Sequence, residues 1–193
     1  TPRVAHRRHI CAAVARTWDS SPHHHAGIAR SGARGRSNRV KRHLVAISDI
    51  HLSELEPTTS GLWMRYRQKP FTPGAEIAAM LEDLVLRVRG DELVLILNGD
   101  VFDFDAPRVS EGKSIPHDLP RTAETSVPAV RAILRDHPEL VGGLARVLVE
   151  GHSLVFVSGN HDAQMTLPEV RAAVREIVVG AAMELALSEA PRR

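Results

Sequence analysis

The sequence of 193 residues contains one cysteine, Cys11, so an internal disulfide is excluded. A chain without disulfides is typical of a reducing compartment, and we expect a cytoplasmic protein. No apolar run approaches the roughly 20 residues that cross a bilayer, which predicts that no segment spans a membrane. With 43% hydrophobic and 25% charged residues, the composition excludes collagen, a coiled coil and wholesale disorder. The length predicts one domain and a remainder.

Acidic residues are almost missing from the first part of the chain. Residues 1–42 carry ten Lys and Arg residues against one acid, Asp19, whereas residues 43–193 carry fifteen basic and twenty-two acidic residues. Rich in Ser, Gly, Arg and His, residues 1–42 are predicted to be a basic, disordered tail, with a targeting segment as the alternative. The net charge averages two unlike parts, so it does not predict nucleic-acid binding.

From His43 onwards, short apolar runs alternate with longer amphipathic stretches. The continuous, partly β-branched runs are typical of strands buried on both faces, and apolar residues at steps of three and four indicate helices. Strands are predicted at 43–48, 92–97 and 152–157, and helices at 75–89, at 125–150 with a break near Pro138, and at 168–187. This alternation predicts an α/β fold with a largely parallel sheet.

Each predicted strand is followed by a cluster of polar residues. The clusters are residues 48–51 (SDIH), 98–103 (NGDVFD) and 158–162 (SGNHD). Ligands of open α/β sheets bind beyond the carboxyl ends of the strands, so we expect the three clusters to meet at one site. The alternative for their aspartates is helix capping.

The residue types in the clusters point to metal binding. If the chain is extended at Asp49 and His51, both side chains project to the same side and can bind one cation. The two carboxylate oxygens of Asp100 can bridge two cations, and Asn160 offers an amide oxygen to the second. Nitrogen and oxygen donors without thiolate suit Mn²⁺, Fe or Zn²⁺. Two such ions roughly 3.5–4 Å apart would clamp a phosphoryl group and supply hydroxide, with His161 as general acid.

The clusters together resemble the motifs of the calcineurin-like metallophosphoesterases. The resemblance covers residues 43–165 and rests on Asp49-x-His51, Gly99-Asp100-x-x-Asp103 and Gly159-Asn160-His161-Asp162 in this order. Within the family, the chain is most similar to the branch of the UDP-2,3-diacylglucosamine pyrophosphohydrolases.

The resemblance implies an α/β/β/α sandwich that hydrolyses a phosphate ester or anhydride with two divalent ions, Mn²⁺ being the first choice. It implies a phosphorylated small molecule or a lipid-nucleotide as substrate, attacked by a hydroxide that both metals activate. By the same resemblance, Asp49 and His51 bind the first metal, Asp100 bridges, Asn160 binds the second, His161 protonates the leaving oxygen and Asp103 orients His161.

The chain also departs from the family pattern. Members continue with further metal-binding histidines and a second sheet, whereas no histidine follows His161 in this sequence. We therefore expect residues 43–193 to be a truncated domain, the amino-terminal half of the sandwich, with one apolar face of its sheet open. The alternatives are a non-catalytic binding module on the same fold and an inactive truncated polypeptide.

Two loops beside the expected site remain open to interpretation. The basic and aromatic residues of the first could hold a phosphate and an apolar or nucleoside group, or form a solvated loop; they are Trp63, Met64, Arg65, Tyr66, Arg67, Lys69 and Phe71. The second, residues 107–125, could form a lid with Arg108, Lys113 and His117. Asp103 and Asp162 either support the site or are solvated loop residues, and a functional metal site at residues 23–25 (HHH) is not expected.

Overall fold

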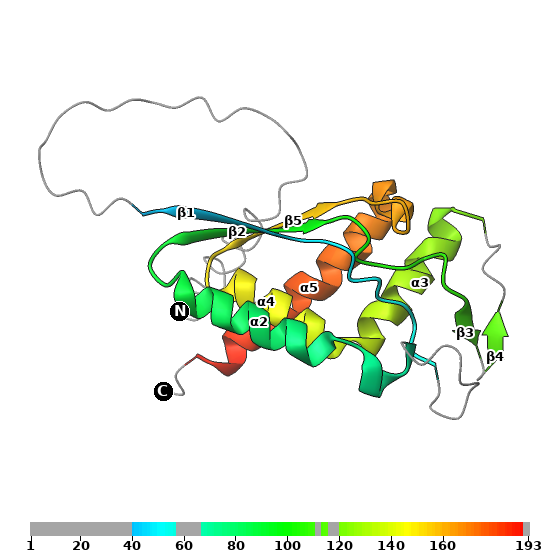
Figure 1. The fold of residues 1–193 in the computed structure, drawn as a ribbon, viewed down its shortest axis with the longest axis horizontal. Helices are drawn as coiled ribbons and strands as arrows, with labels where there is room; N and C mark the ends of the chain where they lie inside the picture. The colour runs from blue at the N-terminus through cyan, green and yellow to red at the C-terminus, as the bar shows by residue number, and fades with distance from the viewer. Residues whose placement is uncertain (1–39, 57–66, 111–112, 116–119, 191–193) are drawn as a thin grey trace, which may run out of the picture.

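A computed structural model of the chain describes residues 40–56, 67–110, 113–115 and 120–190. It contains a small sheet with helices packed against it (Figure 1). Most of the predicted tail, residues 1–42, lies outside the described residues. Arg42, which the sequence assigned to that tail, is instead the first residue of a strand.

The predicted helices and strands are all found, with ends that differ from the expected ones by at most two residues. The strands are β1 (Arg42–Ile47), β2 (Glu92–Asn98), β3 (Arg108–Ser110), β4 (Lys113–Ile115) and β5 (Ser153–Val157). The helices are α2 (Gly74–Arg87), α3 (Ala123–Asp136), α4 (Pro138–Val149) and α5 (Pro168–Ser188), with short 3-10 helices η2 (Lys69–Phe71) and η3 (Ala163–Thr166). The break near Pro138 is confirmed, because a proline begins a helix without losing a hydrogen bond.

The main sheet has three parallel strands with β2 in the centre, between β1 and β5. Its register places Leu44 beside Val94 and Val94 beside Ser153. Parallel neighbours need crossover connections, and here α2 joins β1 to β2 while α3 and α4 join β2 to β5. The carboxyl ends of all three strands therefore lie at the same edge of the sheet. The antiparallel pair β3–β4 lies within residues 107–125, the segment whose role as a lid the sequence left open.

The strands bury only one face of this sheet. In β2, Leu93, Leu95 and Leu97 are at most 1% exposed, while the residues between them are half-buried. On the other face, Leu44 and Val157 are 68% and 42% exposed. The prediction of strands buried on both faces is thus wrong, because α2, α4 and α5 lie on the same side of the sheet (Figure 1). The exposed residues fit the expectation of one open apolar face.

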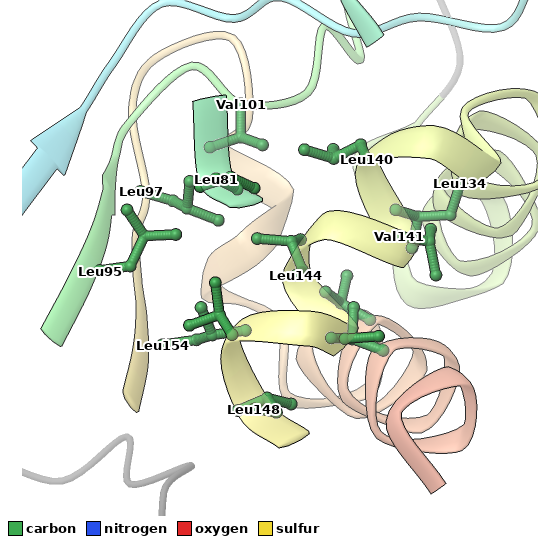
Figure 2. Packing of buried hydrophobic residues seen from close by; sticks show 14 of the residues in the cluster. Leu81, Leu95, Leu97, Val101, Leu134, Leu140, Val141, Leu144, Leu148 and Leu154 are labelled. Carbon is green, nitrogen blue, oxygen red and sulfur yellow. The ribbon is translucent and has the colours of Figure 1, made fainter. Parts of the chain in front are cut away.

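The core lies between the buried face of the sheet and α4. Leucines of α4 point toward Leu95 and Leu97 of β2 (Figure 2). Leu140, Leu144 and Leu148 recur at steps of four, which places them on one side of the helix, and each is at most 2% exposed. On its other sides α4 packs against α2 and α5. This packing fixes the sheet whose edge carries the predicted site.

Candidate metal centre

Backbone hydrogen bonds join the three strand ends into one unit. The amides of Asp49 and His51, after β1, donate to the carbonyls of Gly99 and Asp100, after β2, at 3.3 and 2.9 Å. The amide of Gly99 in turn donates to the carbonyl of Val157, the last residue of β5, at 3.0 Å. The polar clusters predicted to meet at this edge therefore do lie together.

Three of the predicted metal-binding residues have a left-handed backbone. The φ angles are 57° at Asp49, 52° at His51 and 51° at Asp100, and these are the non-glycine residues of positive φ in the described segments. Asp and His tolerate this region better than most residues, but it still costs about 1–3 kcal/mol at each position. Strain of this kind is concentrated at functional sites, where the surrounding structure maintains it.

The sequence led us to expect that an extended backbone lets Asp49 and His51 bind one cation, and this expectation is wrong. An extended chain was expected to send both side chains to one side, but the left-handed conformation turns the chain sharply instead. Helix capping, the alternative role for Asp49 and Asp100, is also wrong. The described residues that directly follow each of them, 50–56 and 101–110, are not helical.

The side chains of Asp49, His51 and Asp100 form a group that can bind a cation. One ligand atom from each lies within 4.8 Å of the other two. Asp49 is exposed, whereas His51 and Asp100 are half-buried, so the group opens to solvent on one side. Two carboxylates and one imidazole, without thiolate, form a donor set that fits a divalent ion such as Mn²⁺.

His161 lies beside this group and contacts it in two ways. Its backbone amide donates to Asp100 Oδ1 at 2.8 Å. Its ring meets that of His51 edge to face, with centroids 4.7 Å apart. Asn160 is exposed and precedes His161 directly, so its backbone runs past the Asp100 carboxylate. The residues predicted to share one site are thus neighbours in space.

Two carboxylates face the imidazole of His161. Its Nδ1 atom lies 3.5 Å from Asp103 Oδ1 and 3.6 Å from Asp105 Oδ2. That nitrogen is buried and has no hydrogen-bond partner among the described residues. Asp103 is held in place by the amides of Asp105 and Ala106, which donate to its Oδ1 at 3.1 and 3.0 Å. Sequence reasoning missed Asp105, although a second acid two residues after Asp103 is a visible signal.

Asp162 is a structural anchor of the site and not a solvated loop residue. It is 1% exposed, and its Oδ2 accepts from the amides of Val101 and Phe102 at 2.9 and 3.4 Å. Its Oδ1 accepts from the amide of Gly159 at 2.5 Å. One carboxylate therefore joins the loop after β5 to the loop after β2, where it satisfies buried amides that would otherwise be unpaired.

Arg67 does not lie open to a phosphate as one interpretation of its loop required. Its guanidinium is buried, forms an ion pair with Glu56 at 2.8 Å and donates to Ser53 Oγ at 3.2 Å. Lys69 lies 3.4 Å from Glu139. Residues 63–66 of that loop lie outside the described residues, as does His117 of the second loop.

Comparison with known proteins adds no family to this description, since no protein-family model, no curated protein and no solved structure matches the chain. Among the described residues, no helix has both the length and the apolar character needed to cross a membrane. The geometry of the strand ends therefore carries the functional argument by itself.

Proposed function

We propose that the chain belongs to a metal-dependent phosphoesterase or pyrophosphohydrolase of the calcineurin-like class, in which these residues form the amino-terminal half of an α/β/β/α sandwich. The observation that carries the proposal is the meeting of Asp49, His51 and Asp100 at two strand ends, with left-handed backbone at each. The open apolar face of the sheet supports the half-sandwich, because a second sheet would cover it.

The positions of the side chains support the following roles. Asp49, His51 and Asp100 would hold one divalent ion, and Asp100 with Asn160 would face a second. Such ions, when bound, polarise phosphoryl oxygens and lower the pKa of water. His161, at the edge of this group, would donate a proton to the oxygen that leaves phosphorus. Asp103 orients the ring of His161, and the substrate is a phosphorylated small molecule or a lipid-nucleotide.

Binding of Mn²⁺ tests the ligand set directly. Titration of the 193-residue chain with Mn²⁺, followed by the loss of the free-ion electron paramagnetic resonance signal, should reveal tight binding. Asp49→Asn and Asp100→Asn should each weaken it at least about tenfold, because even supporting residues of metal sites cost that much. Asparagine tolerates the left-handed backbone, so these variants remove charge without new strain. The control is Asp83→Asn, on the exposed side of α2.

Turnover is the second test. We expect Mn²⁺-dependent hydrolysis of p-nitrophenyl phosphate or bis-p-nitrophenyl phosphate by a natural chain that contains these residues. Asp100→Asn should lower the rate by about 100-fold or more, as expected when an electrostatic group of an active site is removed. Hydrolysis that persists with excess chelator would contradict the proposal. Retained Mn²⁺ binding without turnover by such a chain would favour the non-catalytic module.

A further inference from the structure

The carboxyl edge of the sheet holds a second group of potential metal ligands besides Asp49, His51 and Asp100. One ligand atom each from His51, Asp103 and His161 lies within 4.8 Å of the other two, and all three residues are half-buried. His51 belongs to both groups. The two groups differ in chemistry, because the first has two carboxylates and one imidazole whereas the second has two imidazoles and one carboxylate.

The spacing around His161 Nδ1 fits a metal ion better than a hydrogen bond. Its distances of 3.5 Å to Asp103 and 3.6 Å to Asp105 exceed the roughly 2.7–3.2 Å of a hydrogen bond with a nitrogen donor. Two ligands bound tetrahedrally to Zn²⁺ at roughly 2.0–2.1 Å lie about 3.3–3.4 Å apart, close to the distances found here. The nitrogen is buried and has no hydrogen-bond partner in the part of the chain that the structure describes, and a bound cation would satisfy it.

The supporting structure around this group is already in place. Two backbone amides fix the Asp103 carboxylate by donating to its Oδ1, which leaves the two lone-pair positions of Oδ2 for a cation. Asp105 is held by Arg121, whose Nη2 lies 3.0 Å from its Oδ1, which leaves Oδ2 toward His161. The hydrogen bond from the His161 amide to Asp100 fixes the backbone beneath the ring.

We propose that His51, Asp103 and His161, with Asp105 beside them, form a second cation site that binds a borderline ion such as Zn²⁺ and competes with the first group for His51. A neutral imidazole has one free lone pair, so His51 serves one site at a time. Imidazoles suit Zn²⁺ and carboxylates suit Mn²⁺. Filling the second site therefore removes His51 from the Mn²⁺ group and occupies the ring of His161. Zn²⁺ binding at this second site does not depend on whether the protein hydrolyses phosphoesters.

The test measures Zn²⁺ affinity of the full chain with a competing fluorescent chelator and Mn²⁺ release by electron paramagnetic resonance. We expect His161→Ala and Asp103→Asn to weaken Zn²⁺ binding at least about tenfold, since loss of a direct ligand exceeds the cost of losing a supporting residue. Asp49→Asn should leave Zn²⁺ binding within about threefold and should weaken Mn²⁺ binding. His51→Asn, which keeps the left-handed backbone, should weaken both.

Controls separate this site from other histidines. His43→Ala removes a surface imidazole that pairs with Asp91 at 3.0 Å, and it should change neither affinity. All variants are also made with His23, His24 and His25 replaced by Ser. Circular dichroism checks folding. The absorption spectrum of bound Co²⁺ provides a second measurement, which should differ from the wild type only in the variants at residues 51, 103 and 161. Equal Zn²⁺ affinity in every variant, or a larger loss in Asp49→Asn than in His161→Ala, would overturn the proposal.

Discussion

Gly159 passes so close to Asp100 that any side chain on the glycine would overlap the aspartate. A Cβ atom at Gly159 would meet the Asp100 carboxylate and would lie 2.6 Å from the Asp100 backbone nitrogen. Two strand ends that lie 59 residues apart in the sequence are thus in direct backbone contact. This contact places His161 and Asp100 side by side, so the site requires glycine at residue 159.

Gly159→Ala should therefore both destabilise the protein and weaken the metal centre. The overlap forces the loops after β2 and β5 apart, at a cost of about 1–3 kcal/mol in the free energy of unfolding. Urea denaturation measures this cost, and Mn²⁺ titration measures the second effect. Gly142→Ala in α4 is the matched control, because a Cβ there meets nothing within 4 Å and alanine favours the helix by about 1 kcal/mol. Equal stability of the two variants would contradict this reading.

Asp162→Asn should be strongly destabilising although it changes little in shape. The carboxylate accepts from the amides of Val101, Phe102 and Gly159, and an asparagine would place an NH₂ group toward some of these donors. We expect the free energy of unfolding to fall by roughly 2–4 kcal/mol. Urea denaturation compares this variant with Asp83→Asn, an exposed change on α2 that should cost at most about 0.5 kcal/mol. A similar loss in both variants would exclude Asp162 as an anchor.

The elements and the meeting of the strand ends were predictable from the sequence because both follow from local patterns. Continuous apolar runs indicated the strands, periodicity indicated the helices, and parallel strands must bring their carboxyl ends to one edge. The positions of Asp49, His51 and Asp100 followed from their place directly after strands. Proline at the start of α4 likewise marked the helix boundary.

The conformation and surroundings of the polar residues were not predictable, because distant segments determine them. The left-handed turns at Asp49 and His51 are maintained by carbonyls of residues after β2. Asp162 is buried because amides about 60 residues earlier in the chain need acceptors. Arg67 is buried because Glu56 and Ser53 surround it. In each case the sequence shows a polar loop residue and contains no local signal of its partners.

The open face of the sheet predicts opposite outcomes for two leucines. Leu95→Ala removes a side chain that is fully buried against α4, so the free energy of unfolding should fall by about 2–5 kcal/mol. Leu44→Ala alters a residue that is 68% exposed on the other face, and the change should stay within about 0.5 kcal/mol. Thermal and urea denaturation measure both. A large loss for Leu44→Ala would mean that this face is covered in solution.

Acidification should destabilise the protein through His152, which is 6% exposed beside β2. Burial lowers the pKa of His152 below its usual value, and the carboxylates of Glu150 and Glu92 offset this in part. Its Nδ1 atom lies 3.4 Å from the amide nitrogen of Leu93, which donates to it. As the pH falls through about 6.5, the unfolded chain takes up the proton first, so unfolding becomes more favourable. Above about pH 8 the ring is neutral in both states and contributes no pH dependence.

His152→Gln separates this effect from the titration of other groups. Glutamine loses the imidazole at every pH, so the variant has a lower or equal free energy of unfolding at pH 7.5 but a shallower decline toward about pH 5. The quantity to compare is the slope of the free energy of unfolding against pH, measured by urea denaturation at each pH. Parallel curves for the wild type and the variant would show that the pKa of His152 is the same in the folded and unfolded states. A steeper decline in the variant would reverse the sign of the argument, because it would mean that the folded protein stabilises the charged ring.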